Sequence, residues 1–226
     1  LWVEDPSNQD PRFSRNFLRL EVLPRLEARQ AGASAALART GRLCAEAADL
    51  LDDLADLDLA AMGGTDDHRF NHSMALGLTS PRLRNVLRRV LHGAGALMPD
   101  EERLREAERQ MRQETAAAGW RLVLGSHALC VYRDAWWIEP AGRPVMAVPQ
   151  VWAGEPRLAW AGGAVAFNAA VGQGIAASML HGVCCEIRPR VGGERLRLRS
   201  DGPARSIKNL LQEAAIPPWR RRSLPL

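Results

Sequence analysis

Apolar residues recur with helical spacing over the first half of the chain. Three of them, Phe13, Phe17 and Leu20, lie four and three residues apart, which predicts a helix from about residue 11 with one buried face. Pro24 is expected to end or kink this helix, because proline lacks the N–H of a regular turn and its ring clashes with the turn before it.

A longer apolar stripe follows over 34–62 and predicts the strongest helix of the chain. Acidic residues lie mainly off this stripe. Gly63 and Gly64 are expected to end the helix, because glycine readily adopts the left-handed backbone of a helix C-terminus. The stripe consists of Leu37, Cys44, Ala47, Leu51, Leu54 and Leu57.

Two shorter helices are predicted next. One begins at 79–81, where a capping residue precedes a proline in the first turn. The other runs from Asp100 to near Gly119, and its apolar face is thin. In the first of these helices the inward positions are Leu83, Val86, Leu87, Val90 and Leu91, and the outward positions are Arg82, Arg84, Arg88 and Arg89.

The apolar period then changes from that of a helix to that of a strand. Three short strands are predicted at Trp120–Leu124, His127–Tyr132 and 136–139, with a tight turn at 133–134 before the last of them. We therefore expect a helical bundle closed by a small antiparallel sheet over 30–139.

The last third of the chain has a weaker pattern. Residues 140–183 are rich in Gly, Ala and Pro and carry only short strand candidates, such as 164–168. The composition changes again over 184–226, where 206–215 has the pattern of a short helix. The whole chain is thus expected to have an α+β fold, a helical bundle capped by a small antiparallel sheet and followed by a small mixed α/β C-terminal domain. The inward positions of the last helix are Ile207, Leu210, Leu211 and Ala214.

Composition narrows the class of protein. The 226 residues are 46% hydrophobic and 25% charged, which is ordinary for a globular protein. No apolar run reaches the ~18 residues that a membrane span needs, and no signal peptide is visible. The four cysteines fit neither a zinc motif nor a disulfide framework, so buried reduced thiols in a cytoplasmic protein are expected. They are Cys44, Cys130, Cys184 and Cys185.

Basic charge is concentrated at one end of the chain. The net charge is +4, yet 184–226 alone holds ten basic and four acidic residues, a net of +6, which leaves about −2 for the rest. Lys208 is the only lysine among the 30 Lys and Arg residues. Such a concentration is typical of a nucleic-acid-binding surface.

Two features of this tail suit RNA. In 195–199 arginine and leucine alternate, so a strand would present three guanidiniums roughly 6.6 Å apart and bury the leucines. A solvated edge strand whose charges prevent aggregation has the same pattern. Trp219 directly precedes three arginines, which suits base stacking with phosphate contact, although a structural tryptophan that anchors the turn fits equally well.

Two blocks of the sequence resemble a known family. The first comprises Trp-x-Glu-Asp-Pro-Ser-Asn over 2–8, Arg-Asn-Phe-Leu-Arg over 15–19 and Val-Leu-Pro over 22–24. The second comprises Gly-Gly-Glu over 192–194, Lys-x-Leu-Leu-Gln-Glu over 208–213, Ile-Pro-Pro-Trp-Arg over 216–220 and Pro225. Together with the helical middle and its Trp-Trp strand, these blocks resemble the C-terminal region of bacterial tRNA(Ile)-lysidine synthases over essentially the whole chain.

The sequence departs from this family at the ATP site. The family carries a Ser-Gly-Gly-x-Asp-Ser loop there, whereas the nearest glycine-rich stretches, 162–163 and 172–174, lack the Ser and Asp. The family also continues into further strands after the point where this sequence stops. We therefore expect a fragment, cut at both ends, that is inactive alone and binds neither ATP nor Mg²⁺.

The resemblance implies a domain plan. It assigns 1–29 to the tail of the catalytic domain and a linker helix, 30–139 to a helical tRNA-binding domain, 140–183 to a Gly/Pro-rich connection and 184–226 to a basic, truncated C-terminal tRNA-binding domain. The implied reaction uses ATP to adenylate the carbonyl oxygen at carbon 2 of the wobble cytidine in the CAU anticodon of tRNA(Ile). Free lysine then displaces AMP, so that the tRNA reads as isoleucine instead of methionine.

The resemblance and the charge pattern together name candidate residues. Arg15, Asn16 and Arg19 match the block beside the catalytic pocket, where an arginine would neutralise ATP phosphate or tRNA backbone; solvated arginines on a helix-starting scaffold are the alternative. No catalytic residue is expected in this chain. The candidate tRNA contacts are Arg84, Arg88, Arg89, Arg195, Arg197, Arg199, Arg205, Lys208, Asn209, Gln212, Trp219, Arg220 and Arg221.

Other readings stay open. His68 and His72 are four residues apart beside two aspartates, but a loop or strand does not assure metal geometry there, so no metal site is expected. A generic RNA-binding module would bind without preference among tRNAs. An interaction domain would bury its helical stripes against another protein, and a homodimer is one form of it.

Overall fold

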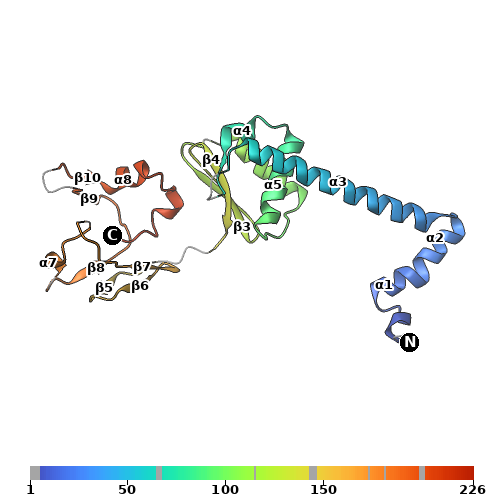
Figure 1. The fold of residues 1–226 in the computed structure, drawn as a ribbon, viewed down its shortest axis with the longest axis horizontal. Coiled ribbons are helices and arrows are strands. Elements are labelled where there is room, and N and C mark those ends of the chain that lie inside the picture. Colours follow the sequence, from blue (N-terminus) through green and yellow to red (C-terminus); the bar gives the residue numbers. More distant parts are fainter. Residues whose placement is uncertain are drawn as a thin grey trace. The chain divides into compact units, whose positions relative to one another are not determined.

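In a computed structural model, the chain forms two compact units. Unit 1 is Leu1–Ala61 and unit 2 is Met62–Leu226 (Figure 1). The structure describes residues 6–64, 68–114, 116–142, 147–172, 174–180, 182–198 and 202–226.

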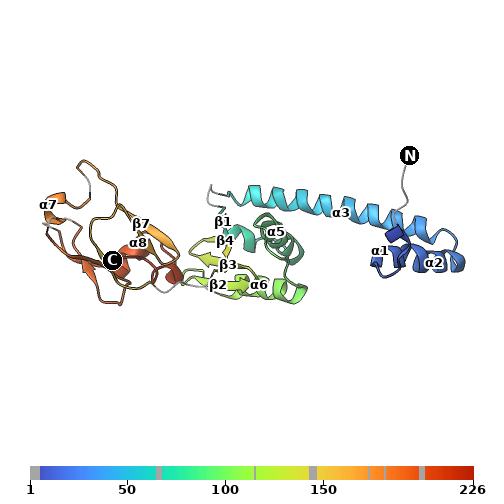
Figure 2. The ribbon, with the colours of Figure 1, turned by 90° about the horizontal axis from the view of Figure 1, so that it is seen from below.

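Unit 1 is helical. A 3-10 turn, η1 (Pro6–Gln9), precedes α1 (Ser14–Phe17), the π-helical segment η2 (Leu18–Val22), α2 (Leu23–Arg29) and the long α3 (Ala33–Ala61), which Figure 2 shows as one unbroken helix. Pro24 does not end the first helix as predicted, since helical structure continues through it to Arg29. The wider π turn directly before it relieves the clash that a proline ring makes with a regular turn.

Burial in unit 1 differs from the predicted pattern. Phe13, Phe17 and Leu20 are exposed rather than buried, at 57%, 43% and 38%. The α3 stripe is also exposed at several predicted core positions, while Ala55 and Asp58 are the residues of α3 that are buried. An apolar period predicts a helix well, but it does not say which apolar side chains another element covers. The exposed α3 positions are Leu37, Cys44, Ala47, Leu51 and Leu57.

Unit 2 begins with a short strand, β1 (Phe70–Asn71), and three helices, α4 (His72–Leu76), α5 (Ser80–Gly93) and α6 (Glu101–Gln113). Asn71 and Asp100 cap α4 and α6 through their side-chain oxygens, which accept the N–H groups of Met74 and Arg103 at 2.8 Å each. The buried positions of α5 are as predicted, except that Val90 is only half-buried. The apolar core residues of α5 and α6 are Leu83, Val86, Leu87, Leu91, Leu104, Ala107 and Met111.

The predicted sheet forms and gains an edge strand. Strands β2 (Trp120–Leu124), β3 (His127–Tyr132) and β4 (Ala135–Pro140) are antiparallel neighbours, and β1 pairs with β4, in the order β1-β4-β3-β2. Because side chains alternate along a strand, β3 serves two cores. Cys130 and Tyr132 lie on one face with Trp137, whereas Leu129, Val131 and Trp136 are buried on the other.

The last third consists of small paired strands. These are β5 (Gln150–Trp152) with β8 (Cys185–Ile187), β6 (Arg157–Trp160) with β7 (Gly163–Ala166), and β9 (Arg195–Leu196) with β10 (Arg205–Ser206). The helices are α7 (Ala177–Leu180), α8 (Ile207–Glu213) and the 3-10 turn η3 (Pro218–Arg220). Ala214, expected to be buried, is exposed, while the other three inward positions are half-buried.

The predicted alternating strand at 195–199 is mostly wrong. Only two of its residues are in β9, and Leu196 and Leu198 are 46% and 62% exposed instead of facing a core. Arg199 lies outside the described residues. A pair of two-residue strands has too little of a second layer above it to bury a row of leucines.

The cysteines are only partly as predicted. All four are free thiols, but Cys44 and Cys184 are exposed and Cys185 is half-buried, so only Cys130 is a core residue. Within the described ranges, none of the helices combines the length and apolar character that crossing a membrane requires.

Candidate nucleic-acid interface

The outer face of α8 presents three polar side chains, and the one acid of the helix, Glu213, lies at its end. Lys208, Asn209 and Gln212 are exposed, and Lys208 has no carboxylate at ion-pair distance among the residues that the structure describes. Arg205, just before the helix, is ion-paired with Glu213 at its end. The sequence pattern therefore correctly predicted that Lys208, Asn209 and Gln212 are exposed to solvent on α8, where the Lys208 ammonium can bind an anion.

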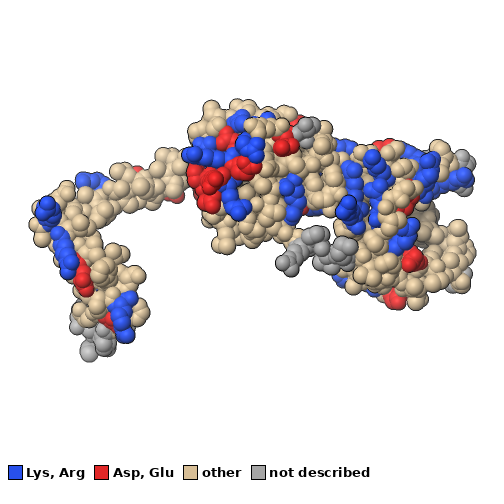
Figure 3. All heavy atoms as spheres, turned by 180° about the vertical axis from the view of Figure 1, so that it is seen from behind, with Lys and Arg blue, Asp and Glu red and all other residues tan. Residues whose placement is uncertain are grey.

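Other cations of the tail differ in how far they are neutralised. Arg195 donates through Nη2 to the carbonyl of Ala204 at 2.6 Å, a neutral acceptor, and no carboxylate of the described residues is ion-paired with it. Arg197 and Arg222 are exposed, and no ion pair involves them in the described part of the chain. Lys and Arg side chains accordingly gather over the C-terminal part on the face drawn in Figure 3, whereas basic and acidic groups intermix over the helical part of unit 2.

One acid of the tail is held as a carboxylate by the backbone. Burial acts to raise the pKa of Glu194, but hydrogen bonds from the backbone, including the N–H groups of Gly192 at 2.8 Å and Val191 at 2.6 Å, lower it to about 2. Its oxygens also lie 3.4 and 3.8 Å from guanidinium nitrogens of Arg190 and Arg188. Glu194 thus closes the turn before β9 and neutralises part of the basic tail.

The predicted arginine face of α5 is engaged within the domain. Arg84 donates to buried Glu108 at 2.6 Å, and Arg88 lies 2.8 Å from Glu101, both across the seam between α5 and α6. Arg84 is only 20% exposed. These arginines therefore hold two helices together, and their role as tRNA contacts, like that of Arg89, stays a prediction.

Asn16 and Arg19 are likewise used within unit 1. The buried amide of Asn16 donates to the carbonyls of Ser7 at 2.7 Å and Asp10 at 3.0 Å, and Arg19 donates to the carbonyl of Asn8 at 2.6 Å. Arg15 is exposed. The contacts of Asn16 and Arg19 fit the scaffold alternative, in which this block fixes the turn before α1.

The last candidates lie against the sheet. We call 217–221 the C-terminal hook. Trp219 packs against Trp137 with ring centroids 6.0 Å apart, Arg220 donates to Glu139 at 2.5 Å, and Arg221 donates to the hydroxyl of Tyr132 at 2.9 Å. The hook and Ala215 cover the face of the sheet that carries Cys130. These contacts support the structural reading of Trp219 and engage both arginines, although neither observation tests a tRNA contact.

Sequence reasoning missed the residues of the sheet that receive the hook. Glu139 is not among the residues that the sequence singles out, yet it also accepts the indole N–H of Trp137 at 3.1 Å and lies 3.3 Å from Arg121. Arg133 donates to the carbonyl of Gln212, and the Arg69 guanidinium lies 4.4 Å from the Trp137 ring. Strand alternation does place Glu139 on the same face as Trp137, and that was the available signal.

Close packing at the hook explains why position 119 is a glycine. Gly119 has a φ of +77°, and a Cβ built there would lie 2.7 Å from the Tyr132 ring, 3.3 Å from Pro218 and 3.4 Å from Trp219. Any side chain would meet both the left-handed backbone and the ring. The junction between sheet and hook therefore depends on a residue without a side chain.

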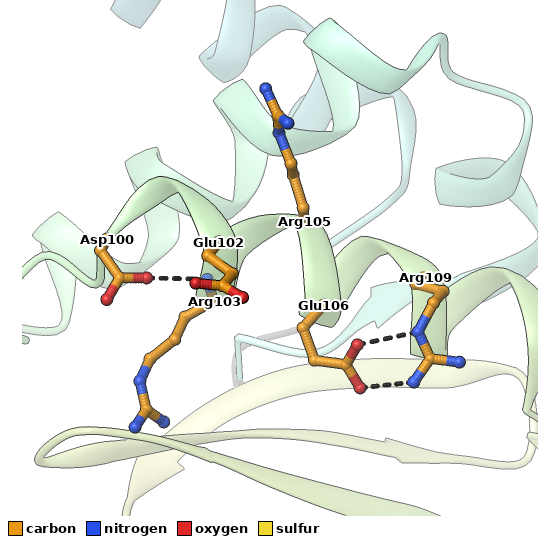
Figure 4. A pocket seen from close by; sticks show the side chains of 6 residues that line it. All are labelled: Asp100, Glu102, Arg103, Arg105, Glu106 and Arg109. Atoms are coloured by element: carbon orange, nitrogen blue, oxygen red, sulfur yellow. Dashed lines mark hydrogen bonds and ion pairs between the residues drawn. The ribbon is translucent and has the colours of Figure 1, made fainter.

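Two pockets of unit 2 have linings that differ from that of a phosphate-binding site. Figure 4 shows a pocket of about 560 Å³ along α6, lined by three carboxylates and three guanidiniums that include the pair Glu106–Arg109. Its carboxylates would repel phosphates. A larger hollow of about 960 Å³ beside Trp152 and Phe167 has Glu155 as its one charged lining residue. Groups of three or more His, Cys, Asp or Glu that could hold a metal are absent from the described residues.

Comparison with protein families gives two matches. The family model of the TilS substrate binding domain matches residues 76–137, and that of the TilS substrate C-terminal domain matches residues 185–226. The first contains α5, α6 and most of the sheet, and the second contains α8 and the hook. Tyr132 and Trp137 thus lie in the first matched segment and the hook lies in the second, while Glu139 lies just beyond the end of the first.

Comparison with individual proteins extends the match to the whole chain. It is 43% identical over 226 residues to a tRNA(Ile)-lysidine synthase of Aromatoleum aromaticum, covering 100% of this chain and 52% of that protein. Proteins of the same name from Azoarcus sp. and Nitrosomonas europaea are 40% and 35% identical, again over 100% of this chain and 48% and 49% of theirs. The chain spans about half the length of these relatives. It belongs to the tRNA(Ile)-lysidine synthase family and carries that family's substrate-binding and C-terminal domains.

Proposed function

We propose that this chain is the tRNA-holding part of a tRNA(Ile)-lysidine synthase. The observation that carries the proposal is the exposed face of α8, where Lys208, Asn209 and Gln212 lie within the segment that the C-terminal family model matches. A lysine without a carboxylate partner suits a phosphate, and side-chain amides suit base edges or sugar hydroxyls. The net charge of +6 over 184–226 attracts the polyanion.

The reaction of the whole enzyme is part of the same proposal. ATP, Mg²⁺ and free lysine would act on the wobble cytidine of tRNA(Ile) with a CAU anticodon, at residues other than those described. The contribution of this chain is positional, because a tRNA body held in one orientation presents one base to the chemistry. A cytoplasmic location is expected for an enzyme that modifies tRNA.

The test is a binding titration with two tRNAs. The purified protein is titrated with unmodified CAU-anticodon tRNA(Ile) and with methionine tRNA across a series of salt concentrations. We expect tighter binding of tRNA(Ile), and Lys208→Glu should weaken it and reduce the slope of log K against log salt by about 1. Arg103→Glu is the matched control, because it makes the same charge change at an exposed position of α6.

The outcomes separate the competing functions. Equal and steeply salt-dependent binding of both tRNAs would leave a generic RNA-binding module. Absence of binding, with circular dichroism showing a folded protein, would favour an interaction domain instead. Equal losses in Lys208→Glu and Arg103→Glu would show that overall charge, rather than the α8 face, governs binding.

A further inference from the structure

The C-terminal hook joins two domains by contacts of three kinds. The Trp219 ring packs at a tilt against Trp137, Arg220 is ion-paired with Glu139, and Arg221 donates a hydrogen bond to the hydroxyl of Tyr132. The bonded residues are 81 and 89 positions apart in sequence. The hook follows α8 directly, so these contacts fix the exposed face of that helix relative to the sheet.

Glu139 is the centre of this junction. Its side chain is 14% exposed and receives the Arg220 guanidinium and the Trp137 indole on Oε2, while the Arg121 guanidinium approaches Oε1. Burial would raise the pKa of Glu139, but the hydrogen bonds from Trp137 and Arg220 outweigh it and lower the pKa below its usual value. The group is therefore a carboxylate that needs its cationic partners.

An acid is unexpected beside a surface that holds RNA. If Glu139 acted only through its charge, it would repel phosphates and compete with them for Arg220. Its removal would then release Arg220 and tighten tRNA binding. If Glu139 instead holds the hook in place, its removal would weaken tRNA binding, because α8 could then leave the orientation that fits the tRNA.

We propose that Glu139 is a positioning residue for tRNA recognition, acting through Arg220 to fix the α8 surface on the sheet. The inference rests on the proposed tRNA-holding function and names a residue that this function depends on without RNA contact. Arg220 then positions α8 together with Glu139, instead of acting as an independent contact to phosphate. The N–H groups of Arg220 that do not bond to Glu139 could still meet a phosphate, but the bond to Glu139 fixes the position of the guanidinium.

The test is a double-mutant cycle with Glu139→Gln, Arg220→Gln and the double variant, titrated with tRNA(Ile) and methionine tRNA. Each single variant should lose about tenfold in affinity for tRNA(Ile) and part of its preference, the loss of one charge-assisted hydrogen bond. The double variant should lose no more than either single one. Arg220→Lys, which keeps a cation at Glu139, should retain most of the affinity.

Folding is checked on the same samples by far-UV circular dichroism and the denaturant midpoint of each variant. Unchanged or tighter binding by Glu139→Gln, or additive losses in the double variant, would overturn the positioning role while leaving the proposed function intact. If the unaltered protein bound neither tRNA, the proposed function would fail first and the positioning role with it. Lys208→Glu separates the cases, since it removes the RNA contact without touching the hook.

Discussion

His72 is a buried histidine at the start of α4. Its side chain is 4% exposed, and its Nε2 atom has no hydrogen-bond partner among the described residues. Burial lowers its pKa from 6.5, while a hydrogen bond with the backbone of Met111 and the charge of Asp134 oppose the shift without cancelling it. The folded protein therefore keeps a neutral imidazole where the unfolded chain takes up a proton.

The free energy of unfolding is expected to fall as the pH decreases below about 6.5. A base whose pKa is lowered by folding stabilises the fold above its ordinary pKa and loses that contribution as protons bind the unfolded chain. Urea titrations between pH 5 and 8 should show this loss, and His72→Leu should reduce it. Asp134 does not interfere, because its pKa lies below 3.8 through hydrogen bonds from Ser73. An identical pH dependence in His72→Leu would assign the effect to other histidines.

Cys130 is the buried thiol under the hook. Burial and the nearby carboxylate of Glu139 raise its pKa to about 12, so almost no thiolate forms at pH 8. A disulfide reagent at that pH should modify exposed Cys44 and Cys184 quickly, while Cys130 reacts only after unfolding. Peptide mass spectrometry over time identifies the order. Rapid modification of Cys130 in the native protein would mean that the hook leaves the sheet readily.

At the scale of elements, Glu108 joins two helices. It is 7% exposed and binds Arg84 of α5 at 2.6 Å and Arg112 of α6 at 3.1 Å. Burial raises its pKa, but hydrogen bonds from Ser80, Arg84 and Arg112 lower it overall. Glu108 is buried more deeply than Glu101, the other carboxylate that joins α5 to α6, so it is the polar contact of this seam that depends most on its partners.

Glu108→Ala is expected to destabilise unit 2 by about 2–3 kcal/mol, because it leaves two charge-assisted hydrogen bonds unmade at partly buried arginines. Denaturant titration of both proteins measures the loss. Glu106→Gln is the matched control, since its pair with Arg109 lies on the solvent face of α6 and should contribute no measurable stability. Equal effects of the two substitutions would contradict the role of Glu108.

Elements with a long period were readable from the sequence. The extent of α3, the starts of α5 and α6 and the strands β2 to β4 agree with the predicted ones to within one residue, because a long helical period or an apolar run between turns leaves little ambiguity. Of the small strands, β7 overlaps the candidate at 164–168, but the others were not predicted, since two to four residues carry little period. Burial on α3 was mispredicted because a stripe shows which residues share a face and not what covers it.

The candidate surface was readable only where it is local. The spacing of Lys208 and Gln212 placed both on the outer face of α8, as the structure shows. The partner of Arg220 lies 81 residues away and the partner of Arg221 lies 89 residues away, and no pattern within either segment announces such contacts. The engaged state of Arg84 was missed for the same reason.

At the scale of the molecule, the two units differ in how much they bury. In unit 1 the described residues that are buried are Asn16, Ala55 and Asp58, whereas unit 2 holds two cores on its main sheet. Backbone hydrogen bonds open locally in proportion to the packing around them.

Amide hydrogen exchange should therefore be fastest over 14–50 and slowest in β3 and β4. Exchange followed by mass spectrometry on the intact chain resolves these segments by peptide. Glu108→Ala should speed exchange in α5 and α6 but leave unit 1 unchanged, which makes unit 1 its internal control. Protection over 14–50 equal to that of β3 would contradict the difference in packing.

The contact between Glu139 and Arg220 limits which C-terminal segments can be exchanged between relatives. One partner lies just beyond the segment matched by the substrate-binding family model, and the other lies inside the C-terminal one. A chimera that takes its last 42 residues from another relative would acquire that relative's hook together with this chain's receptor face. Such a chimera should keep its affinity for tRNA where the residues at 139 and 220 form an ion pair and lose it otherwise, so the two positions have to be exchanged together.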